Sequence, residues 1–133
     1  MRQNIQSTGL HAGKVWNILN QEGKLNTKQL EKNSKLTEEE IHTAIGWLAR
    51  ENKISEEQNT FFLGETNLTI KIGKHAGMIW KILDIWEEAD LLSITHLARI
   101  DKKDAYEALG WLAREGKIQT TMNEKKISYQ LKE

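Results

Sequence analysis

Histidine and acidic side chains are the groups in this chain that could ligate a metal or move a proton. The four histidines lie at positions 11, 42, 75 and 96, and none has a second histidine one helical turn away, as a helical zinc site requires. Cysteine is absent, and there is neither a glycine-rich phosphate loop nor a nucleophile–histidine–acid arrangement. The sequence therefore predicts no catalytic residue, no metal and no cofactor. We expect neither an enzyme nor a small-molecule substrate.

A second group of side chains could contact nucleic acid. Lysines neutralise phosphate charge, and several of them lie in the second half of the chain near a tyrosine. The candidates are Lys102, Lys103, Tyr106, Lys125 and Lys126. They form one basic patch if the segments that carry them fold side by side. Otherwise the lysines are ordinary solvated residues.

A third group is apolar and could contact a protein. Ile85, Trp86 and Leu91 lie at the end of a helical stretch and just after it, and Trp86 stands where the first half of the chain has Glu22. If Trp86 faces inward, it instead extends the core by one turn or covers the contact between the two halves. The sequence leaves these alternatives open.

Composition limits the partners. The chain has 19 basic and 19 acidic residues, whereas nucleic-acid-binding domains usually carry a basic excess. Any affinity for DNA is therefore expected to be weak and to fall with salt. No stretch approaches the roughly 18 apolar residues that cross a bilayer, and the first residues lack the apolar core of a signal peptide. We therefore expect a cytoplasmic protein with no membrane span.

An internal repeat reveals the elements that position these groups. Residues 11–16 (HAGKVW) recur as residues 75–80 (HAGMIW), and residues 44–51 (AIGWLARE) recur as residues 108–115 (ALGWLARE). Both blocks return after the same 64 residues, which indicates the duplication of one unit.

Each copy predicts three helices followed by a β-hairpin. A helical stripe of apolar residues opens each copy and a short second helix follows. Residues 37–40 and 101–104 then have the pattern of a helix start, which predicts the third helix. Alternating apolar and polar residues flank Gln58-Asn59 and Asn123-Glu124, as is typical of a hairpin.

The predicted fold class is α+β, mainly α, with two tandem winged helix-turn-helix units. We place the first unit at residues 1–66 and the second at residues 67–133. The connection from Gly64 to Ile72 is short and mixed in composition, so we expect the copies to be held together rather than freely mobile.

The second helices align less regularly. Leu25 and Leu30 match Leu92 and Leu97 at an offset of 67 residues, which predicts three extra residues in copy two after its first helix. Ser93 has a side chain that favours helix N-termini, and it is expected to cap the second helix of this copy.

The third helices bear on DNA binding, because this helix enters the major groove in winged helix-turn-helix proteins. Its predicted exposed face in copy one carries Glu38, Glu39, His42 and Thr43. The equivalent face in copy two carries Lys102, Lys103, Tyr106 and Glu107. Two carboxylates at the start of the helix in copy one would repel phosphate oxygens, so copy two is expected to be the main DNA contact.

The repeated small and aromatic residues are expected to serve packing. Gly46 and Gly110 lie inside the third helices, where glycine costs about 1 kcal/mol relative to alanine. A close backbone explains them, and we expect it to be the first helix near Gly13 or Gly77. Four repeated tryptophans are expected in the core: Trp16, Trp47, Trp80 and Trp111.

Two repeated arginines, Arg50 and Arg114, lie in the last turn of the third helices. A cation there suits the helix dipole, and it can also form a salt bridge. We expect one of these structural roles in preference to a contact with phosphate.

The repeated motifs resemble those of a known family. Its short members carry the pattern Ala-Gly-x-x-Trp in the first helix and Leu-Gly-Trp-Leu-Ala-Arg-Glu in the third. Residues 76–80 and 109–115 match both patterns, and residues 12–16 and 45–51 match with Ile45 in place of leucine. The chain thus resembles a tandem duplication of a bacterial and archaeal winged helix-turn-helix family of unassigned function. The resemblance covers nearly the whole chain and implies a DNA-binding or regulatory role, without catalytic residues. Most members resemble single units, so this chain looks like a fused dimer of them.

Two functions of different classes follow. The first is a DNA-binding transcriptional regulator in which copy two makes most of the contacts. The second is a protein–protein interaction or scaffold subunit, by analogy with the tandem winged helices of chromosome-condensation and ESCRT-type complexes. The family resemblance favours the first function. Zero net charge and the acidic third helix of copy one favour the second, with a protein partner or a homodimer as its target.

Overall fold

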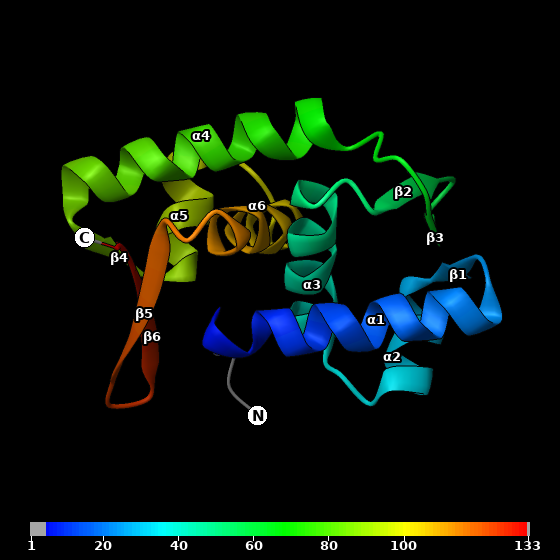
Figure 1. The fold of residues 1–133 in the computed structure, drawn as a ribbon. Helices are drawn as coiled ribbons and strands as arrows, with labels where there is room; N and C mark the ends of the chain where they lie inside the picture. Colours follow the sequence, from blue (N-terminus) through cyan, green and yellow to red (C-terminus); the bar gives the residue numbers. More distant parts are fainter. Residues whose placement is uncertain (1–4, 133) are drawn as a thin grey trace.

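The computed structural model describes residues 5–132 and contains the unit twice (Figure 1). Copy one comprises a 3-10 turn (Ile5–Ser7), α1 (Thr8–Glu22), β1 (Leu25–Asn26), α2 (Thr27–Ser34), α3 (Glu38–Arg50), β2 (Ile54–Glu57) and β3 (Thr60–Leu63). Copy two comprises α4 (Thr69–Trp86), β4 (Glu88–Ala89), α5 (Leu91–Ala98), α6 (Lys102–Arg114), β5 (Ile118–Asn123) and β6 (Lys126–Leu131). The predicted order of three helices and a hairpin is confirmed in both copies.

Side-chain caps set the start of the helices. Asn26 and Gln29 form a capping box at α2, and Thr37 and Glu40 form the predicted one at α3. In copy two, α6 begins at the predicted Asp101 cap. These caps satisfy backbone N–H groups that the first turn of a helix leaves without partners.

The start of α5 differs from the prediction. Its cap is Asp90, whose carboxylate accepts the backbone N–H of Ser93 at 2.8 Å. Ser93 therefore lies inside the helix and does not cap it. The hydrogen bonds from Ser93 hold the pKa of the Asp90 carboxyl below its ordinary value.

Each copy is completed by a small antiparallel sheet, with strand order β1-β3-β2 in copy one and β4-β6-β5 in copy two. The short first strands bring Leu25 opposite Phe61 and Ala89 opposite Tyr129. The hairpin of copy two is longer, since its strands have six residues each where those of copy one have four. It forms the projecting wing at the lower left of Figure 1.

The copies keep the 64-residue offset through their second helices, and the predicted shift to 67 was wrong. Leu30 and Ile94 are the equivalent core residues, both with 0% exposure, whereas Leu92 and Leu97 are 66% and 47% exposed. The prediction failed because it matched leucines by type and not by their place in the core. The extra residues of copy two lie in its hairpin.

Each copy has its own hydrophobic core, but each core also contains residues from the other copy. Ile5, at the start of copy one, packs into the core of copy two. Leu68 and Ile72, at the start of copy two, pack into the core of copy one. Because each core includes apolar side chains of the other copy, these contacts hold the two copies together. The expected boundary between residues 66 and 67 falls in the connection between β3 and α4.

Membrane insertion of a helix can be judged from length and hydropathy. Across residues 5–132, none of the helices combines the length and the apolar character that a bilayer crossing needs.

Candidate interaction surfaces

The third helices of the two copies cross each other at two glycines. A Cβ atom on Gly46 would lie 1.7 Å from the backbone oxygen of Glu107, and one on Gly110 would lie 1.9 Å from that of Thr43. Backbones can approach this closely only where a side chain is absent. The crossing of α3 and α6 therefore requires glycine at both positions.

The neighbour of these glycines is not the one predicted. Gly13 and Gly77 of the first helices have open space beside them, because a Cβ atom on either would meet nothing within 4 Å. The expectation that another backbone approaches closely is confirmed. The expectation that the first helix supplies it was wrong, since the contact is made by the third helix of the other copy.

The crossing removes most of both third helices from the surface. His42 and Thr43 of α3 are 4% and 1% exposed, and Glu107 of α6 is fully buried. The prediction that these three residues lie on an exposed, DNA-facing surface was wrong, because the other copy covers that surface. Glu38 and Glu39, in the first turn of α3, remain exposed as predicted.

A buried hydrogen bond joins the crossing helices. His42 Nδ1 lies 2.9 Å from Glu107 Oε2, and the two side chains are 5% and 1% exposed. The second carboxylate oxygen of Glu107 is buried and meets no hydrogen-bond donor among residues 5–132. Removing one partner of a buried hydrogen-bonded pair leaves a buried polar group unsatisfied, which is unfavourable. His42 and Glu107 therefore favour the state in which the copies stay together.

Four charged residues form a reciprocal arrangement at the C-terminal ends of α3 and α6, here called the Arg–Glu cluster. Arg50 Nε donates to Glu115 at 3.0 Å, and Arg114 Nε donates to Glu51 at 2.9 Å. The predicted salt-bridge role of both arginines is confirmed. Their partners come from the other copy, so the cluster is a further link between the copies.

The repeated tryptophans lie at the edges of the cores. Trp16, Trp47 and Trp111 are partly buried, and Trp80 is 39% exposed. The predicted core position is therefore wrong for Trp80 and holds only in part for the other three. Trp47 and Trp111 each lie beneath an arginine of the other copy, at 5.8 and 5.6 Å between guanidinium and ring centre.

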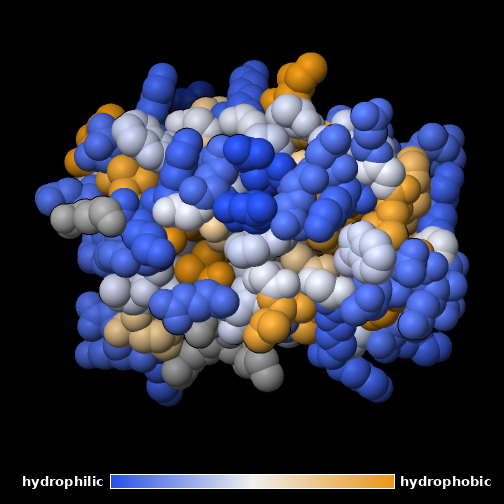
Figure 2. All heavy atoms as spheres, in the orientation of Figure 1, coloured by the Kyte–Doolittle hydropathy of each residue, from blue (hydrophilic) through white to orange (hydrophobic). Residues whose placement is uncertain are grey.

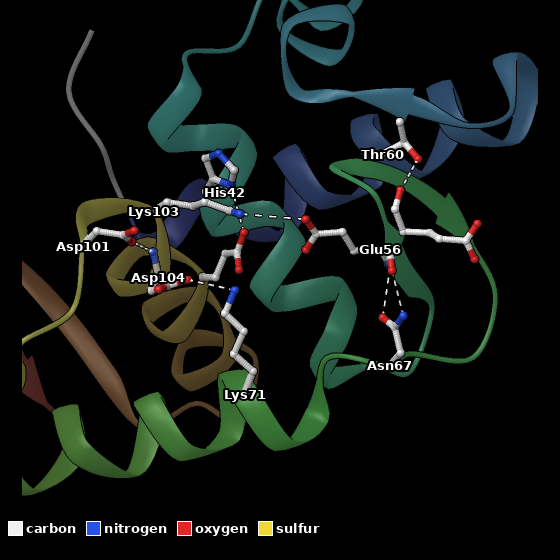
Figure 3. A network of polar contacts seen from close by, with 10 residues as sticks. His42, Glu56, Thr60, Asn67, Lys71, Asp101, Lys103 and Asp104 are labelled. Carbon is white, nitrogen blue, oxygen red and sulfur yellow. Dashed lines mark hydrogen bonds and ion pairs between the residues drawn. The ribbon is translucent and has the colours of Figure 1, made fainter.

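The lysines predicted to contact DNA lie on two different elements. Lys102 and Lys103 begin α6, where Lys103 Nζ reaches toward Glu56 of β2 at 3.8 Å (Figure 3). Lys125 and Lys126 lie at the turn of the β5–β6 hairpin, where Lys126 pairs with the capping carboxylate of α5 at 3.3 Å. Figure 1 shows the tip of this hairpin pointing away from α6. The structure therefore brings one lysine of each pair to a carboxylate and does not bring the two pairs together.

Tyr106, the fifth candidate, is held at the contact between the copies. Its side chain packs against the core of copy two, and burial together with the negative charge of Glu39 raises its pKa to about 12.

Nearby, Lys71 of α4 pairs with Asp104 at 3.2 Å (Figure 3). Burial lowers the pKa of Lys71, but the hydrogen bond and charge of Asp104 outweigh it and the pKa is raised.

Copy two carries four exposed large apolar side chains at the end of α4 and on α5, of which Trp86 and Leu97 line one pocket; together they are here called the copy-two apolar surface. Its members are Ile85 (74% exposed), Trp86 (59%), Leu92 (66%) and Leu97 (47%). Figure 2 shows hydrophobic residues over the end of α4, at the left, in a surface that is otherwise mostly hydrophilic. Leu91, which the sequence also suggested, is partly buried against the core of copy two.

The copy-two apolar surface has no equivalent in copy one. The residues 64 positions earlier are all polar: Gln21, Glu22, Lys28 and Asn33. Beside the surface lies a pocket of about 320 Å³ whose lining includes Trp86, Ala89, His96 and Leu97. Leu92 and Leu97 were missed because the shifted alignment paired them with Leu25 and Leu30, which are core residues. A constant offset of 64 would have placed them outside.

Metal binding has no support in the described part of the chain. No three histidine, aspartate or glutamate side chains within residues 5–132 come together in a way that could hold a metal ion.

Comparison with known proteins identifies the domain. The family described as winged helix-turn-helix domain (DUF2582) matches residues 1–62 and again residues 66–131. No curated protein matches the chain. A solved structure of the mRNA-binding domain of elongation factor SelB from E. coli, in complex with SECIS RNA, is similar at 13% identity and a TM-score of 0.38, over 92% of this chain and 98% of that one. The winged helix-turn-helix is a fold of the nucleic-acid-binding type. With both copies matched over nearly their whole length, the chain belongs to the DUF2582 winged helix-turn-helix family and contains its domain twice.

Proposed function

We propose that this protein is a non-enzymatic protein-interaction module, and that a protein partner docks on the copy-two apolar surface. The observation that carries the proposal is the crossing of α3 and α6 at Gly46 and Gly110. A helix that reads the major groove must present its side chains to the bases. Here His42, Thr43 and Glu107 face the other copy, so presenting them to a groove would first require the two copies to separate.

Separation of the copies would be costly. It would split the His42–Glu107 pair, whose members are 4% and 0% exposed, and would open the Arg–Glu cluster. It would also withdraw Ile5 from the core of copy two, and Leu68 from that of copy one. The assembled form is therefore the one that meets a partner.

The assembled form offers a partner an apolar surface on one copy only. Exposed apolar patches rimmed by polar residues mark sites of protein contact. The copy-two apolar surface places an aromatic ring beside a pocket, as in the anchor residues that dominate binding at many interfaces. An apolar side chain of the partner, seated against Trp86 and Leu97, fits this chemistry.

The repeat supplies a matched test. Exchanging the copy-two apolar surface for the residues of copy one gives I85Q/W86E/L92K/L97N, which leaves both cores unchanged. The control is L10K/I70Q, which alters two other exposed apolar residues, 80% and 88% exposed, to the residues of the opposite copy. A partner captured by cross-linking should be purified and its dissociation constant measured against each variant.

The first variant is expected to weaken binding by about tenfold or more, while the control leaves it unchanged. Equal binding to all three proteins would overturn the proposal. Sedimentation of the protein alone distinguishes a separate partner from a second copy, because a homodimer held by this surface would dissociate in the first variant.

A DNA-binding transcriptional regulator is the second candidate, favoured by the family fold. Lys102 and Lys125 are exposed and, among the described residues, form no ion pair, so they are free to meet phosphate. Under this candidate, changing Lys102, Lys103, Lys125 and Lys126 to glutamate abolishes binding to duplex DNA at low salt. The interaction module predicts DNA titrations that do not depend on these lysines.

A further inference from the structure

Two surface pockets are built from the same residues in the two copies. One lies between α1 and the end of α3, with a volume of about 410 Å³, and the other lies between α4 and the end of α6, with about 440 Å³. The nine residues that line the first stand 64 positions before the nine that line the second, and eight of the nine are identical. The exception is Asn17, replaced by Lys81. We call these sites the tryptophan pockets.

Core packing accounts for only part of this identity. None of residues 20–43 is identical to its counterpart 64 positions later, although the segment contributes to the core. Leu30 and Ile41 are fully buried, and so are Ile94 and Ala105, which replace them in copy two. The buried Ala12 and Leu48 of the pocket are also kept, as Ala76 and Leu112, but the copies have diverged at buried positions elsewhere and still kept the half-exposed tryptophans of the pockets.

An exposed glycine keeps each pocket open. Gly13 and Gly77 lie in the middle of α1 and α4, where glycine is less favourable than alanine. A Cβ atom on either would meet nothing within 4 Å, so no neighbouring group in the chain requires glycine there. This separates them from Gly46 and Gly110, whose neighbours leave no room. A bound ligand that occupies the space beside each glycine would explain why both positions lack a side chain.

The walls and the rim define the chemistry of that group. Two indoles line each pocket, Trp16 and Trp47 in copy one, and offer planar apolar surface. At the rim, Glu51 is approached by Lys53 at 3.6 Å and by Arg114 at 2.9 Å. In copy two the equivalent carboxylate is held by two cations in the same way, at 3.4 and 3.0 Å. The copy-one rim therefore has one negative and two positive groups, and the copy-two pocket has Lys81 as a third cation, which favours an anion and disfavours a cation.

We propose that each tryptophan pocket binds one small aromatic anion, with its ring against the indoles and its carboxylate or phosphate toward the lysine and arginine of the rim. The volumes are those of pockets that hold one small ligand. The pockets lie on either side of the Arg–Glu cluster, which supplies an arginine to each rim. The full chain then binds two equivalents. This site is separate from the copy-two apolar surface.

Intrinsic fluorescence can test the proposal on the full chain. Four of the five tryptophans line the pockets, so Trp86→Glu leaves only pocket reporters. The probes are phenylacetate, its amide and phenethylamine, which share a ring, differ in charge and do not emit in the tryptophan range, together with adenosine monophosphate and adenosine. Saturation at two equivalents is expected, with the carboxylate at least about tenfold tighter than the amine. The stronger of the two anions identifies the carboxylate or the phosphate as the group recognised. Failure of both anions to saturate, or equal binding of the amine, would overturn the proposal.

Filling one pocket provides the matched variant. Gly13→Leu is expected to leave one binding equivalent, and G13L/G77L none, while both variants unfold at higher temperature because the helices gain a better helix former. Loss of binding together with gain of stability is a result that a purely structural role of the glycines does not produce. Two equivalents retained in G13L/G77L would refute the proposal. The I85Q/W86E/L92K/L97N variant is expected to bind both anions normally, so failure here is distinct from failure of the interaction module.

Discussion

Gly46 of α3 lies so close to Glu107 of α6 that a Cβ atom on the glycine would be 1.7 Å from the carbonyl oxygen of Glu107. The repeat reproduces the relationship on the other side of the crossing, where Gly110 faces Thr43. Two helices of the kind that reads DNA in other winged helix-turn-helix proteins are thus packed into each other. The two copies are thus held together through their third helices.

Alanine in place of either crossing glycine should push α3 and α6 apart and lower the free energy of unfolding. Gly46→Ala and Gly110→Ala are each expected to destabilise the protein by about 1–3 kcal/mol, as overpacking does, even though alanine is the better helix former. Gly13→Ala is the control, because it has open space beside it and should stabilise the protein by about 1 kcal/mol. Urea unfolding midpoints measure all three. A Gly46→Ala protein as stable as Gly13→Ala would contradict the close approach.

The buried His42–Glu107 pair should show coupling. His42→Tyr removes the hydrogen-bonding nitrogen that meets Glu107 and is expected to cost about 1–3 kcal/mol. The residues 64 positions away from this pair are Tyr106 and Thr43, so the double variant H42Y/E107T gives both sides of the crossing the same residues. It should be more stable than the sum of the two single changes predicts, by about 0.5–3 kcal/mol. Additive free energies of unfolding would show that the pair does not couple the copies.

The sequence predicted the architecture well because the repeat and the caps are local signals. The Thr37 and Asp101 caps and both hairpins lie where the pattern placed them. The glycines in the third helices also predicted a close contact, because glycine destabilises a helix and is expected there only where a side chain would not fit. The identity of the contacting element could not be predicted, because periodicity defines the faces of a helix and not what covers them.

The candidate sites were harder to predict for the same reason. His42 and Glu107 have residue types expected on a surface, and only the packing of one copy on the other buries them. Leu92 and Leu97 have residue types expected in a core, and they lie on the surface. In the first case the burial depends on the packing of the other copy, and in the second it depends on the register of the helix. The local sequence pattern indicates neither the packing nor the register.

The Asp90 cap should contribute to stability in a pH-dependent way. Asp90→Ala removes the carboxylate that accepts the N–H of Ser93 and should cost about 1 kcal/mol at neutral pH. The hydrogen bonds from Ser93 lower the pKa of Asp90 from its ordinary 3.8. A lowered pKa means that the folded state favours the charged form, so the contribution is present above pH 3.8 and is lost as the pH falls below it. Thermal unfolding of both proteins across this range should show the difference vanishing in acid; a constant difference would contradict the role of the charge.

Alkaline pH should weaken the protein through its tyrosines. Burial and Glu39 raise the pKa of Tyr106 from 10.0 to about 12, and burial also raises that of Tyr129. A raised pKa means that the folded state favours the neutral phenol, so this stability is complete below pH 10 and is lost as the pH rises toward 12. Tyr106→Phe removes one of the two ionisations and should make the decline in the free energy of unfolding shallower over that interval. The chain has two tyrosines, so tyrosinate absorbance of the folded protein tests the same cause. Half-maximal absorbance near pH 10 would contradict it, because it would mean that both phenols ionise as they do in water.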